Sequence, residues 1–279
     1  MNQNTNNYFQ TSYGSFNWHF SASTLRILAI LFMIIDHIGA YLLYNFQKTS
    51  IATLMLYKLL RAIGRLSFPL FVFLLIQGFE HSHNRKSYLL RLIITACISE
   101  PFFDYAGSRS FFNLNSQNTI FTLALILIMF LILEYIYQNV NPQILKIVLS
   151  ILTLVITIAI GHMTKIDYGE VGPLYACALL LLSGLIRQNP SMSFGYMLIL
   201  VFASSVIKHS ISHPDLLCSS SGLYTILSSA MEIQLFSSLS VFIISAYDGT
   251  KGLKLPKKFC YAIYPAQLII FALIKYFLI

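Results

Sequence analysis

Two ionisable residues, Asp36 and His37, stand side by side near the centre of an apolar stretch, LRILAILFMIIDHIGAYLLY, residues 25–44. An imidazole titrates near neutral pH, so a histidine at this position could take a proton from a nucleophile. The next apolar stretch carries Arg61 and Arg65, which are four residues apart and therefore share one face of a helix. These four residues are the first candidates for a buried site with acid–base or group-transfer chemistry.

The expected depths of these residues are similar. At a rise of 1.5 Å per residue, a helix starting near residue 23 places Asp36 about 20 Å along its axis, and a returning helix starting near residue 54 places the two arginines about 10 and 16 Å from the opposite surface. A charge at the bilayer centre costs at least about 2.5–3.5 kcal/mol, so such groups pair or face a polar cavity. We expect an arginine of the second helix to neutralise Asp36. We expect the side chain of His37 to point in a different direction. An ion-pair staple between two helices would explain the pairing, but four ionisable groups at one depth favour a site.

The elements that position these residues are membrane helices. Of the 279 residues, 57% are hydrophobic and 10% are charged, and the mean hydropathy is +0.71, whereas soluble domains carry about 25% charged residues. About 20 apolar residues span a bilayer, so we predict an all-α polytopic membrane helical bundle with about nine transmembrane helices (eight to ten). The predicted helices are residues 23–44, 54–79, 87–105, 118–138, 143–161, 171–187, 193–209, 223–247 and 259–279.

The distribution of basic residues predicts a topology. Residues 1–21 form a polar tail that contains no Lys or Arg, so we expect no cleaved signal peptide, and residues 22–279 form a single transmembrane domain. More Lys and Arg residues fall on the side of the N-terminus than on the other side. The positive-inside rule then predicts a cytoplasmic tail, in an integral protein of a bacterial-type cytoplasmic membrane.

A basic loop follows the second predicted helix, with Arg85 and Lys86 in EHSHNRK and Arg91 at the start of the next helix. Topology alone explains such a loop. Below a cavity that holds arginines, the loop could also bind the phosphates of a nucleotide-bearing donor, together with Lys257 and Lys258 before the last helix.

Other polar residues give weaker signals. Glu232 falls inside the predicted helix 223–247 and is a further cavity candidate, whereas Asp167, in KIDYGEVGP, is best explained as a cap at a helix N-terminus. The pairs His81/His83 and His209/His213 lack further ligands at suitable spacing, so we expect no metal. No basic run interleaved with aromatic residues occurs outside the apolar segments, so we expect no nucleic-acid partner.

Several sequence blocks together resemble the TraX-like membrane proteins, a family named for the conjugative-pilin N-acetylase. The blocks are MIIDHIGA, LRAIGRLSFPLFVFLLIQGFEHSHN followed by YLLRL, NTIFTLAL, IDYGEVG, AYDGTKG and CYAIYPAQL, and they occur in the expected order from residue 25 to about 270. The family is also distantly similar to the heparan-α-glucosaminide N-acetyltransferases, which are membrane enzymes that take acetyl groups from cytosolic acetyl-CoA.

The resemblance implies roles for particular residues. It makes Asp36 and His37 the family's Asp-His pair, and it implies an acyltransferase-like domain over residues 22–279. The other matching positions are Gly64, Arg65, Pro69, Gly78, Phe79, Arg91, Asn118 and Thr122. One departure concerns Tyr264 and Gln267, because the family pattern leads us to expect Tyr-Pro-x-His where this chain has Tyr-Pro-Ala-Gln. A glutamine cannot exchange a proton, but it can hydrogen-bond a carbonyl.

The resulting hypothesis is a membrane-embedded N-acetyltransferase. Acetyl-CoA would be the co-substrate, held by Arg65, Arg85, Lys86, Arg91, Asn118, Lys257 and Lys258. The acceptor would be a peptide N-terminus or an amino sugar, reached across the bilayer. His37 would take the acetyl group or the amine proton, Asp36 would set a charge state, and Arg61, Arg65 or Gln267 would face the oxyanion.

Two alternatives remain at this point. A transporter or exporter of a small anion could use the same Asp/His/Arg cluster as its substrate site, and a structural membrane subunit would need no such cluster. The sequence is also compatible with a homodimer.

Overall fold

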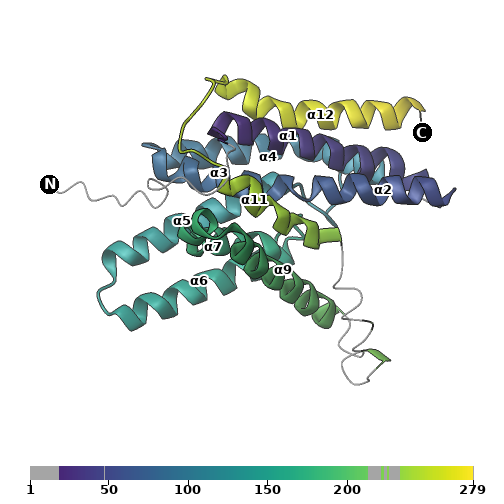
Figure 1. The fold of residues 1–279 in the computed structure, drawn as a ribbon. Helices are drawn as coiled ribbons and strands as arrows, with labels where there is room; N and C mark the ends of the chain where they lie inside the picture. Colours follow the sequence, from purple (N-terminus) through teal and green to yellow (C-terminus); the bar gives the residue numbers. More distant parts are fainter. Residues whose placement is uncertain (1–18, 47, 213–220, 223–224, 226–232, 279) are drawn as a thin grey trace. The chain divides into compact units, whose positions relative to one another are not determined.

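The computed structural model describes residues 19–46, 48–212, 221–222, 225 and 233–278. Within these ranges the chain is helical, as predicted, and its β-structure is limited to two isolated bridges, Phe20 to Tyr247 and Gln117 to Ile166 (Figure 1). The α-helices are α1 Ala22–His37, α2 Ile51–Gly64, α3 Ser67–His81, α4 Arg85–Ser108, α5 Thr119–Asn139, α6 Gln143–Met163, α7 Val171–Leu181, α8 Ser183–Gln188, α9 Pro190–Ser212, α11 Ser240–Ser245 and α12 Lys257–Leu278. The remaining elements are a π-helical turn, η1 Ile38–Leu43, and two 3₁₀ helices, η2 Tyr44–Phe46 and η4 Ile233–Leu239.

Five segments of the described chain are long and apolar enough to cross a membrane: Ala22–Phe46, Ile51–His81, Thr119–Asn139, Gln143–Met163 and Lys258–Phe277. The predicted count of nine is therefore not confirmed. Three further apolar helices, Val171–Leu181, Pro190–Val206 and Ile233–Ser245, are shorter. Helix α4 is long enough but carries Arg85, Lys86, Arg91, Glu100 and Asp104.

Two predicted helices have interruptions. The second is broken between α2 and α3, at Arg65 and Leu66, one turn before Pro69. Proline lacks an N–H, so Pro69 cannot bond the carbonyl of Arg65 four residues earlier, and this missing hydrogen bond accounts for the break. The sixth is interrupted at Leu182 before Ser183 and Gly184, which have low helix propensity. Of the eighth, residues 223–247, the continuously described part is η4 and α11 with the two residues that follow.

The chain divides into two compact units, each assembled from separated stretches. The first comprises Met1–Asp36, Lys58–Leu74 and Cys177–Lys254, and the second comprises His37–Tyr57, Leu75–Ala176 and Leu255–Ile279. The expectation of one domain from residue 22 onward stays a prediction. The tail predicted over residues 1–21 lies mostly outside the described residues.

In the first unit, α9 packs against α8, α11 and η4, with the rings of Phe194 and Phe242 5.3 Å apart between centroids. The backbone of Phe20 donates to the carbonyl of Ala246 at 2.8 Å and accepts from Asp248 at 3.0 Å, which ties the start of α1 to the segment after α11. Four buried serines, Ser237, Ser238, Ser240 and Ser245, occupy η4 and α11. Small residues of this kind let membrane helices approach closely.

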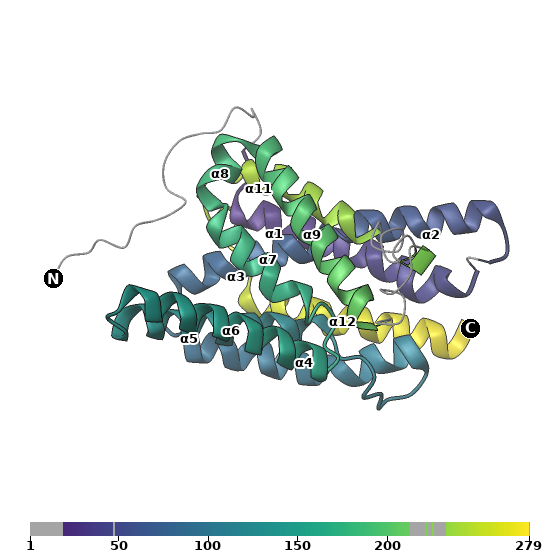
Figure 2. The ribbon, with the colours of Figure 1, turned by 90° about the horizontal axis from the view of Figure 1, so that it is seen from below.

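In the second unit, α4 packs against both α12 and α5, and α5 packs against α6 (Figure 2). Helices α4 and α12 are parallel, because their contacts join start to start and end to end. Arg91 donates to the Tyr261 hydroxyl at 3.3 Å near both N-termini, and Lys275 donates to the carbonyls of Ala106 and Gly107 at 2.7 and 3.0 Å near both C-termini. The lysine thus supplies donors to carbonyls that the end of a helix leaves unpaired.

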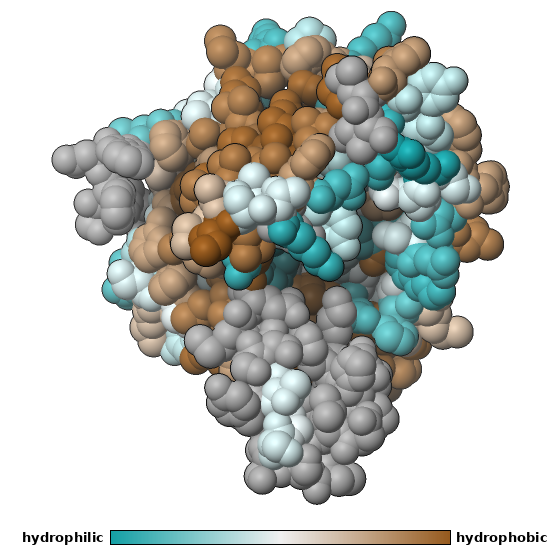
Figure 3. Space-filling view, turned by 90° about the vertical axis from the view of Figure 1, so that its right-hand side faces the viewer, coloured by the Kyte–Doolittle hydropathy of each residue, from teal (hydrophilic) through white to brown (hydrophobic). Residues whose placement is uncertain are grey.

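Large apolar side chains are exposed on the described surface (Figure 3). They are most frequent on α6, where only 17% of the spanning window is buried. The exposed α6 residues are Ile144, Leu145, Ile147, Val148, Ile151, Leu152, Val155, Ile156, Ile160 and Met163. Apolar exposure on this scale fits a helix that faces lipid.

The loop between α6 and α7 lies directly against α6 at a pair of glycines. A Cβ atom added to Gly161 would lie 2.2 Å from the carbonyl oxygen of Gly169, and one added to Gly169 would lie 2.5 Å from that of Gly161. Both clashes are with backbone, so no side chain can move aside.

We predict that Gly161→Ala destabilises the protein, because the loop must shift to admit the methyl group, and overpacking of this kind costs about 1–3 kcal/mol. Thermal unfolding in detergent measures the loss. Gly107→Ala is the matched control, since nothing lies within 4 Å of its added Cβ. Equal melting temperatures for the two variants would contradict the close contact.

Candidate functional site

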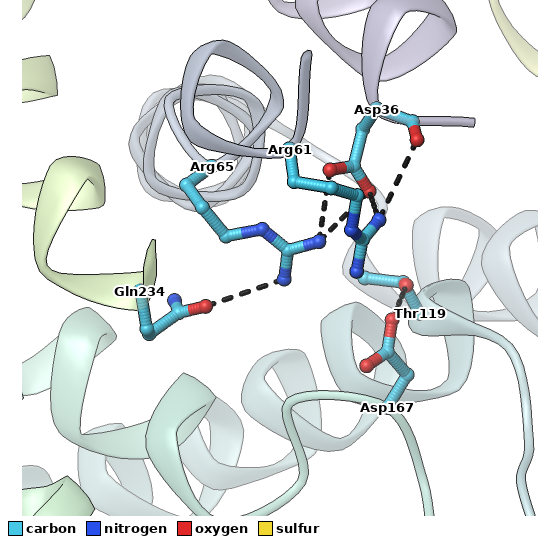
Figure 4. Close-up of polar contacts among 6 residues, drawn as sticks. All are labelled: Asp36, Arg61, Arg65, Thr119, Asp167 and Gln234. Atoms are coloured by element: carbon cyan, nitrogen blue, oxygen red, sulfur yellow. Dashed lines mark hydrogen bonds and ion pairs between the residues drawn. The ribbon is translucent and has the colours of Figure 1, made fainter. Parts of the chain in front are cut away.

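The first unit contains a cluster in which one carboxylate accepts from two guanidinium groups (Figure 4). Arg61 Nη1 lies 2.5 Å from Asp36 Oδ2, and Arg65 Nη2 lies 2.8 and 2.9 Å from Asp36 Oδ1 and Oδ2. The side chains are 12–23% exposed. The predicted neutralisation of Asp36 by an arginine is therefore confirmed, and it involves both arginines.

Gly64 allows this cluster to form. A Cβ atom at position 64 would lie 2.3 Å from the Asp36 Cβ and 2.7 Å from its Cα. The chain can bring α1 and α2 this close only without a side chain at that position. Residue 64 lies between the two arginines in sequence, so the same contact that excludes a methyl group brings both guanidinium groups to the carboxylate.

Gln234, which the sequence analysis did not single out, extends the cluster. Arg65 Nη1 donates to Gln234 Oε1 at 3.3 Å (Figure 4). The only sequence signal was a polar residue within an apolar stretch, which carries no information about a partner 169 positions away. Glu232, a predicted cavity residue two positions earlier, lies outside the described residues.

The Asp36 cluster is suited to holding a helix in place. Both oxygens of the carboxylate accept from guanidinium groups, so Asp36 is not placed to act as a proton acceptor for a substrate. An ion pair with several hydrogen bonds among apolar helices fixes their mutual rotation.

His37 belongs to the second unit, where it is 8% exposed and surrounded by aromatic rings. Its ring centroid lies 5.3 Å from that of Tyr41, 6.0 Å from Tyr264 and 6.1 Å from Phe271. His37 also stands where α1 changes into the π-helical turn η1, and π turns inside α-helices are frequent at functional sites. The prediction that His37 and the two arginines share one pocket stays a prediction.

The α12 residues beside His37 include both candidates from the C-terminal block. Tyr264 and Gln267 are 7% and 6% exposed. Among the described residues, neither amide atom of Gln267 has a hydrogen-bond partner.

Asn118 and Asp167 organise the start of α5. Asn118 caps that helix, because its Oδ1 accepts from the backbone of Ile120 at 3.0 Å, and its Nδ2 donates to Ala96 at 2.9 Å and to the carboxylate of Glu100. Its amide is thus used within the protein, and the predicted binding of acetyl-CoA by Asn118 has no support in this geometry.

Asp167 does not cap α7, which begins four residues later at Val171. Its carboxylate accepts from the Thr119 hydroxyl at 2.7 Å (Figure 4), and its backbone N–H donates to Gln117 at 2.9 Å. The predicted capping role is corrected, because the residue ties the α6–α7 loop to α5 instead.

The basic residues predicted to hold phosphates gather at one end of the second unit. Arg85 begins α4 and pairs with Glu134, with its guanidinium 4.1 Å from the Phe79 ring centroid. Lys86 follows it and is exposed, and Lys258, at the parallel start of α12, is exposed as well. Arg91, one and a half turns into α4, donates to Tyr261. The side chain of Lys257 lies outside the described residues.

Metal ligation finds no support in the described ranges, where no group of three or more His, Cys, Asp or Glu side chains is arranged to hold an ion. His81 bonds the carbonyl of Gln77 through Nδ1 at 2.9 Å, and His209 and His213 have no described side chains.

A family model described as TraX protein matches residues 21–275, from the start of α1 almost to the end of α12. The chain belongs to the TraX family. The resemblance drawn from its sequence blocks is thereby confirmed.

One relative of this TraX family member is a protein from Dichelobacter nodosus named "Probable fimbrial assembly protein FimC, serogroup H1". The two are 37% identical over 123 residues, which is 42% of this chain and 48% of the relative. The match thus spans about half the length of that protein. No solved structure matches the chain.

We predict that Asp36→Asn destabilises the protein more than Arg61→Gln. The first change leaves two cations without their carboxylate, whereas the second leaves Asp36 paired with Arg65. Removing one partner of a buried pair costs about 3–5 kcal/mol, and the partial exposure here places the expected loss for Asp36→Asn at the lower end. Thermal unfolding of the detergent-solubilised protein measures the order.

The control for this comparison is Lys58→Gln, an exposed cation one turn before Arg61. It is expected to unfold like the unchanged protein. An Asp36→Asn variant as stable as this control would show that the ion pair contributes nothing.

Proposed function

We propose that the protein is a membrane-embedded acetyltransferase that moves an acetyl group from acetyl-CoA to a primary amine. Membership of the TraX family supports this reading, since the resemblance set out above implies an N-acetylase. The single structural observation that carries it is His37, a buried imidazole inside a membrane-spanning segment, surrounded by rings and next to polar side chains of α12.

Acetyl transfer from a thioester requires a base for the amine proton and stabilisation of an oxyanion. His37 supplies the base. It lies against Tyr264, and a buried imidazole that is shielded by rings keeps water away from an activated thioester. Either His37 takes the proton while the amine attacks directly, or it accepts the acetyl group first and passes it on.

The donor enters at the parallel N-termini of α4 and α12. Helix N-termini attract phosphate through their unpaired N–H groups and their dipole, and here Lys86, Arg91 and Lys258 add positive charge. From Lys258 to Gln267 the axis of α12 rises about 14 Å at 1.5 Å per residue. The extended pantetheine arm of CoA can span this distance, so phosphates at the helix ends and a thioester beside His37 are compatible in one ligand.

The Asp36 cluster is assigned a positioning role. Adjacent residues on a helix differ in direction by about 100°, so the rotation of α1 that pairs Asp36 with Arg61 and Arg65 also sets the direction in which His37 leaves the helix. This replaces the earlier hypothesis that the two arginines face the oxyanion, because their guanidinium groups contact Asp36.

The acceptor is an amine that reaches the site from the side opposite the donor, if the N-terminus is cytoplasmic as the basic residues predict. The name of the Dichelobacter relative, a probable fimbrial assembly protein, favours the N-terminus of a fimbrial or pilin-type subunit. An amino sugar is the other acceptor class.

The test uses the purified chain in lipid vesicles with radiolabelled acetyl-CoA and two acceptor probes, glucosamine and a short synthetic peptide with a free alanine N-terminus. Label transferred to either probe supports an acetyltransferase. An anion transporter would instead move a labelled small anion across the vesicle membrane in the absence of CoA, and such uptake without acetyl transfer would overturn the proposal.

We predict that His37→Ala lowers the rate of transfer at least about 100-fold, since a positioned general base contributes about 10²–10⁴, while the variant still inserts and unfolds cooperatively. His83→Ala, an exposed histidine in the loop before α4, is the control and retains activity. Full transfer by His37→Ala would remove this residue from the chemistry. In the absence of acceptor, label retained on the unchanged protein but lost in His37→Ala would identify the covalent route.

We also predict that Lys86→Gln combined with Lys258→Gln raises the KM for acetyl-CoA and leaves kcat unchanged, because the two cations contact only the nucleotide end of the donor. Acetyl-pantetheine, which lacks the nucleotide phosphates, is the control substrate, and its KM is expected to be the same with and without the substitutions. Equal effects on the KM values of both donors would show that the two lysines do not act through the nucleotide phosphates. The KM difference for acetyl-CoA should also shrink at high salt.

A further inference from the structure

Gln267 is a buried polar side chain whose hydrogen-bonding capacity is not used by the described protein. It is 6% exposed, and both Oε1 and Nε2 lack a partner. A buried donor or acceptor without a partner costs free energy, so proteins rarely keep one without a function. An amide with both ends unsatisfied is able to bind a ligand that offers an acceptor and a donor together.

The position of Gln267 on α12 places it beside His37. Tyr264, Gln267 and Phe271 are separated by three and four residues, so they share one face of the helix. The ring of His37 lies 6.0 Å from Tyr264 and 6.1 Å from Phe271, and Gln267 lies between these two contacts along the helix. The unsatisfied amide therefore occupies the face of α12 that the imidazole contacts.

The geometry of a carboxamide limits what it can bind. Its C=O and its N–H₂ leave one carbon as adjacent branches, so the matching ligand carries an acceptor and an N–H donor on one carbon and on the same side. A trans secondary amide, the product of acetyl transfer, places its C=O and N–H on opposite sides. A tetrahedral adduct can rotate about its C–N bond and present both groups to the carboxamide at once.

We propose that Gln267 binds the tetrahedral intermediate of acetyl transfer at both reacting atoms, an inference that rests on the function proposed above. The amine nitrogen attacks the thioester carbon, the C–N bond forms, and the carbonyl π electrons move to the oxygen. Gln267 Nε2 donates to this oxyanion, and Gln267 Oε1 accepts one N–H of the attacking amine. His37 takes the other N–H proton, the C–S bond breaks as C=O re-forms, and the imidazolium returns the proton to the CoA thiolate.

This arrangement makes Gln267 a determinant of acceptor class. A primary amine carries one N–H for His37 and one for Gln267. A secondary amine has a single N–H, which the base must remove, so Oε1 would stay unpaired in the transition state. Sites that hydrogen-bond a substrate group reject the analogue that lacks it, because their buried polar atom is left unpaired.

The test compares Gln267→Leu with the unchanged chain in vesicles, using radiolabelled acetyl-CoA and two peptide probes that differ only in an alanine or N-methylalanine N-terminus. With the alanine peptide, kcat is expected to fall about 100-fold, the effect typical of losing one oxyanion donor, while the KM for acetyl-CoA is unchanged. The preference for the alanine peptide over the N-methylalanine peptide is expected to shrink, because the variant has no acceptor for the second N–H.

Thermal unfolding separates this role from a structural one. Replacing an unsatisfied buried amide by an apolar side chain of similar volume removes a penalty, so Gln267→Leu is expected to melt at the same temperature as the unchanged protein or higher. Gln77→Leu is the matched control: Gln77 is a buried glutamine, 7% exposed, whose Nε2 donates to Glu80 at 3.3 Å. This control is expected to lose stability and to keep its acceptor preference.

Three results would overturn the proposal. A Gln267→Leu variant with unchanged kcat and preference would remove Gln267 from the transition state while leaving the acetyltransferase assignment intact. A lower melting temperature with an unaltered acceptor preference would show that the amide is structural. An unchanged chain that transfers no label to glucosamine or to either peptide would overturn the proposed function itself, and the role of Gln267 with it.

Discussion

The contact on which the first unit depends is the one between the Asp36 carboxylate and the guanidinium groups of Arg61 and Arg65. Charges inside a membrane-spanning segment are tolerated when they pair and hydrogen-bond one another. The pairing imposes two further requirements on the chain. Residue 64 must be glycine, because its added Cβ would clash with the Asp36 backbone, and α1 must hold a single rotation. Because His37 is the next residue of α1, that rotation also sets the direction in which its side chain leaves the helix.

Hydropathy and simple geometry predicted much of the fold. The five long apolar segments were all predicted within a few residues, and the break before α3 follows from the missing N–H of Pro69. The count of nine is not confirmed, because apolar length is a poor guide for some of the predicted helices. Helix α4 has the length to span a bilayer but carries charges near both ends: Arg85 pairs with Glu134, Asp104 accepts from the backbone N–H of Asn113, and Lys86 is exposed. Hydropathy cannot distinguish such a helix from one that faces lipid.

The candidate site was predictable only where two residues were close in depth along neighbouring helices. Depth alone predicted the pairing of Asp36 with an arginine. It could not predict that Gln234 contacts Arg65, because that contact depends on how a distant segment folds back. Asn118 shows a second limit: an amide that matched a family block was expected to bind a ligand, and the sequence did not reveal that it caps α5 and bonds Glu100. A residue type and a motif do not reveal which hydrogen bonds the protein itself satisfies.

Buried polar side chains of the described chain differ in whether the protein itself satisfies them, and the difference bears on chemistry. Asp36 and Asn118 carry strong donors or acceptors, and the protein satisfies them internally. Gln267 is neutral and unsatisfied, and it lies on the α12 face that His37 contacts. A neutral amide without a partner costs far less free energy in an apolar environment than an unpaired charge at the same place. A membrane enzyme that must stabilise a transient oxyanion without keeping a permanent bare charge would be expected to use a group of this kind.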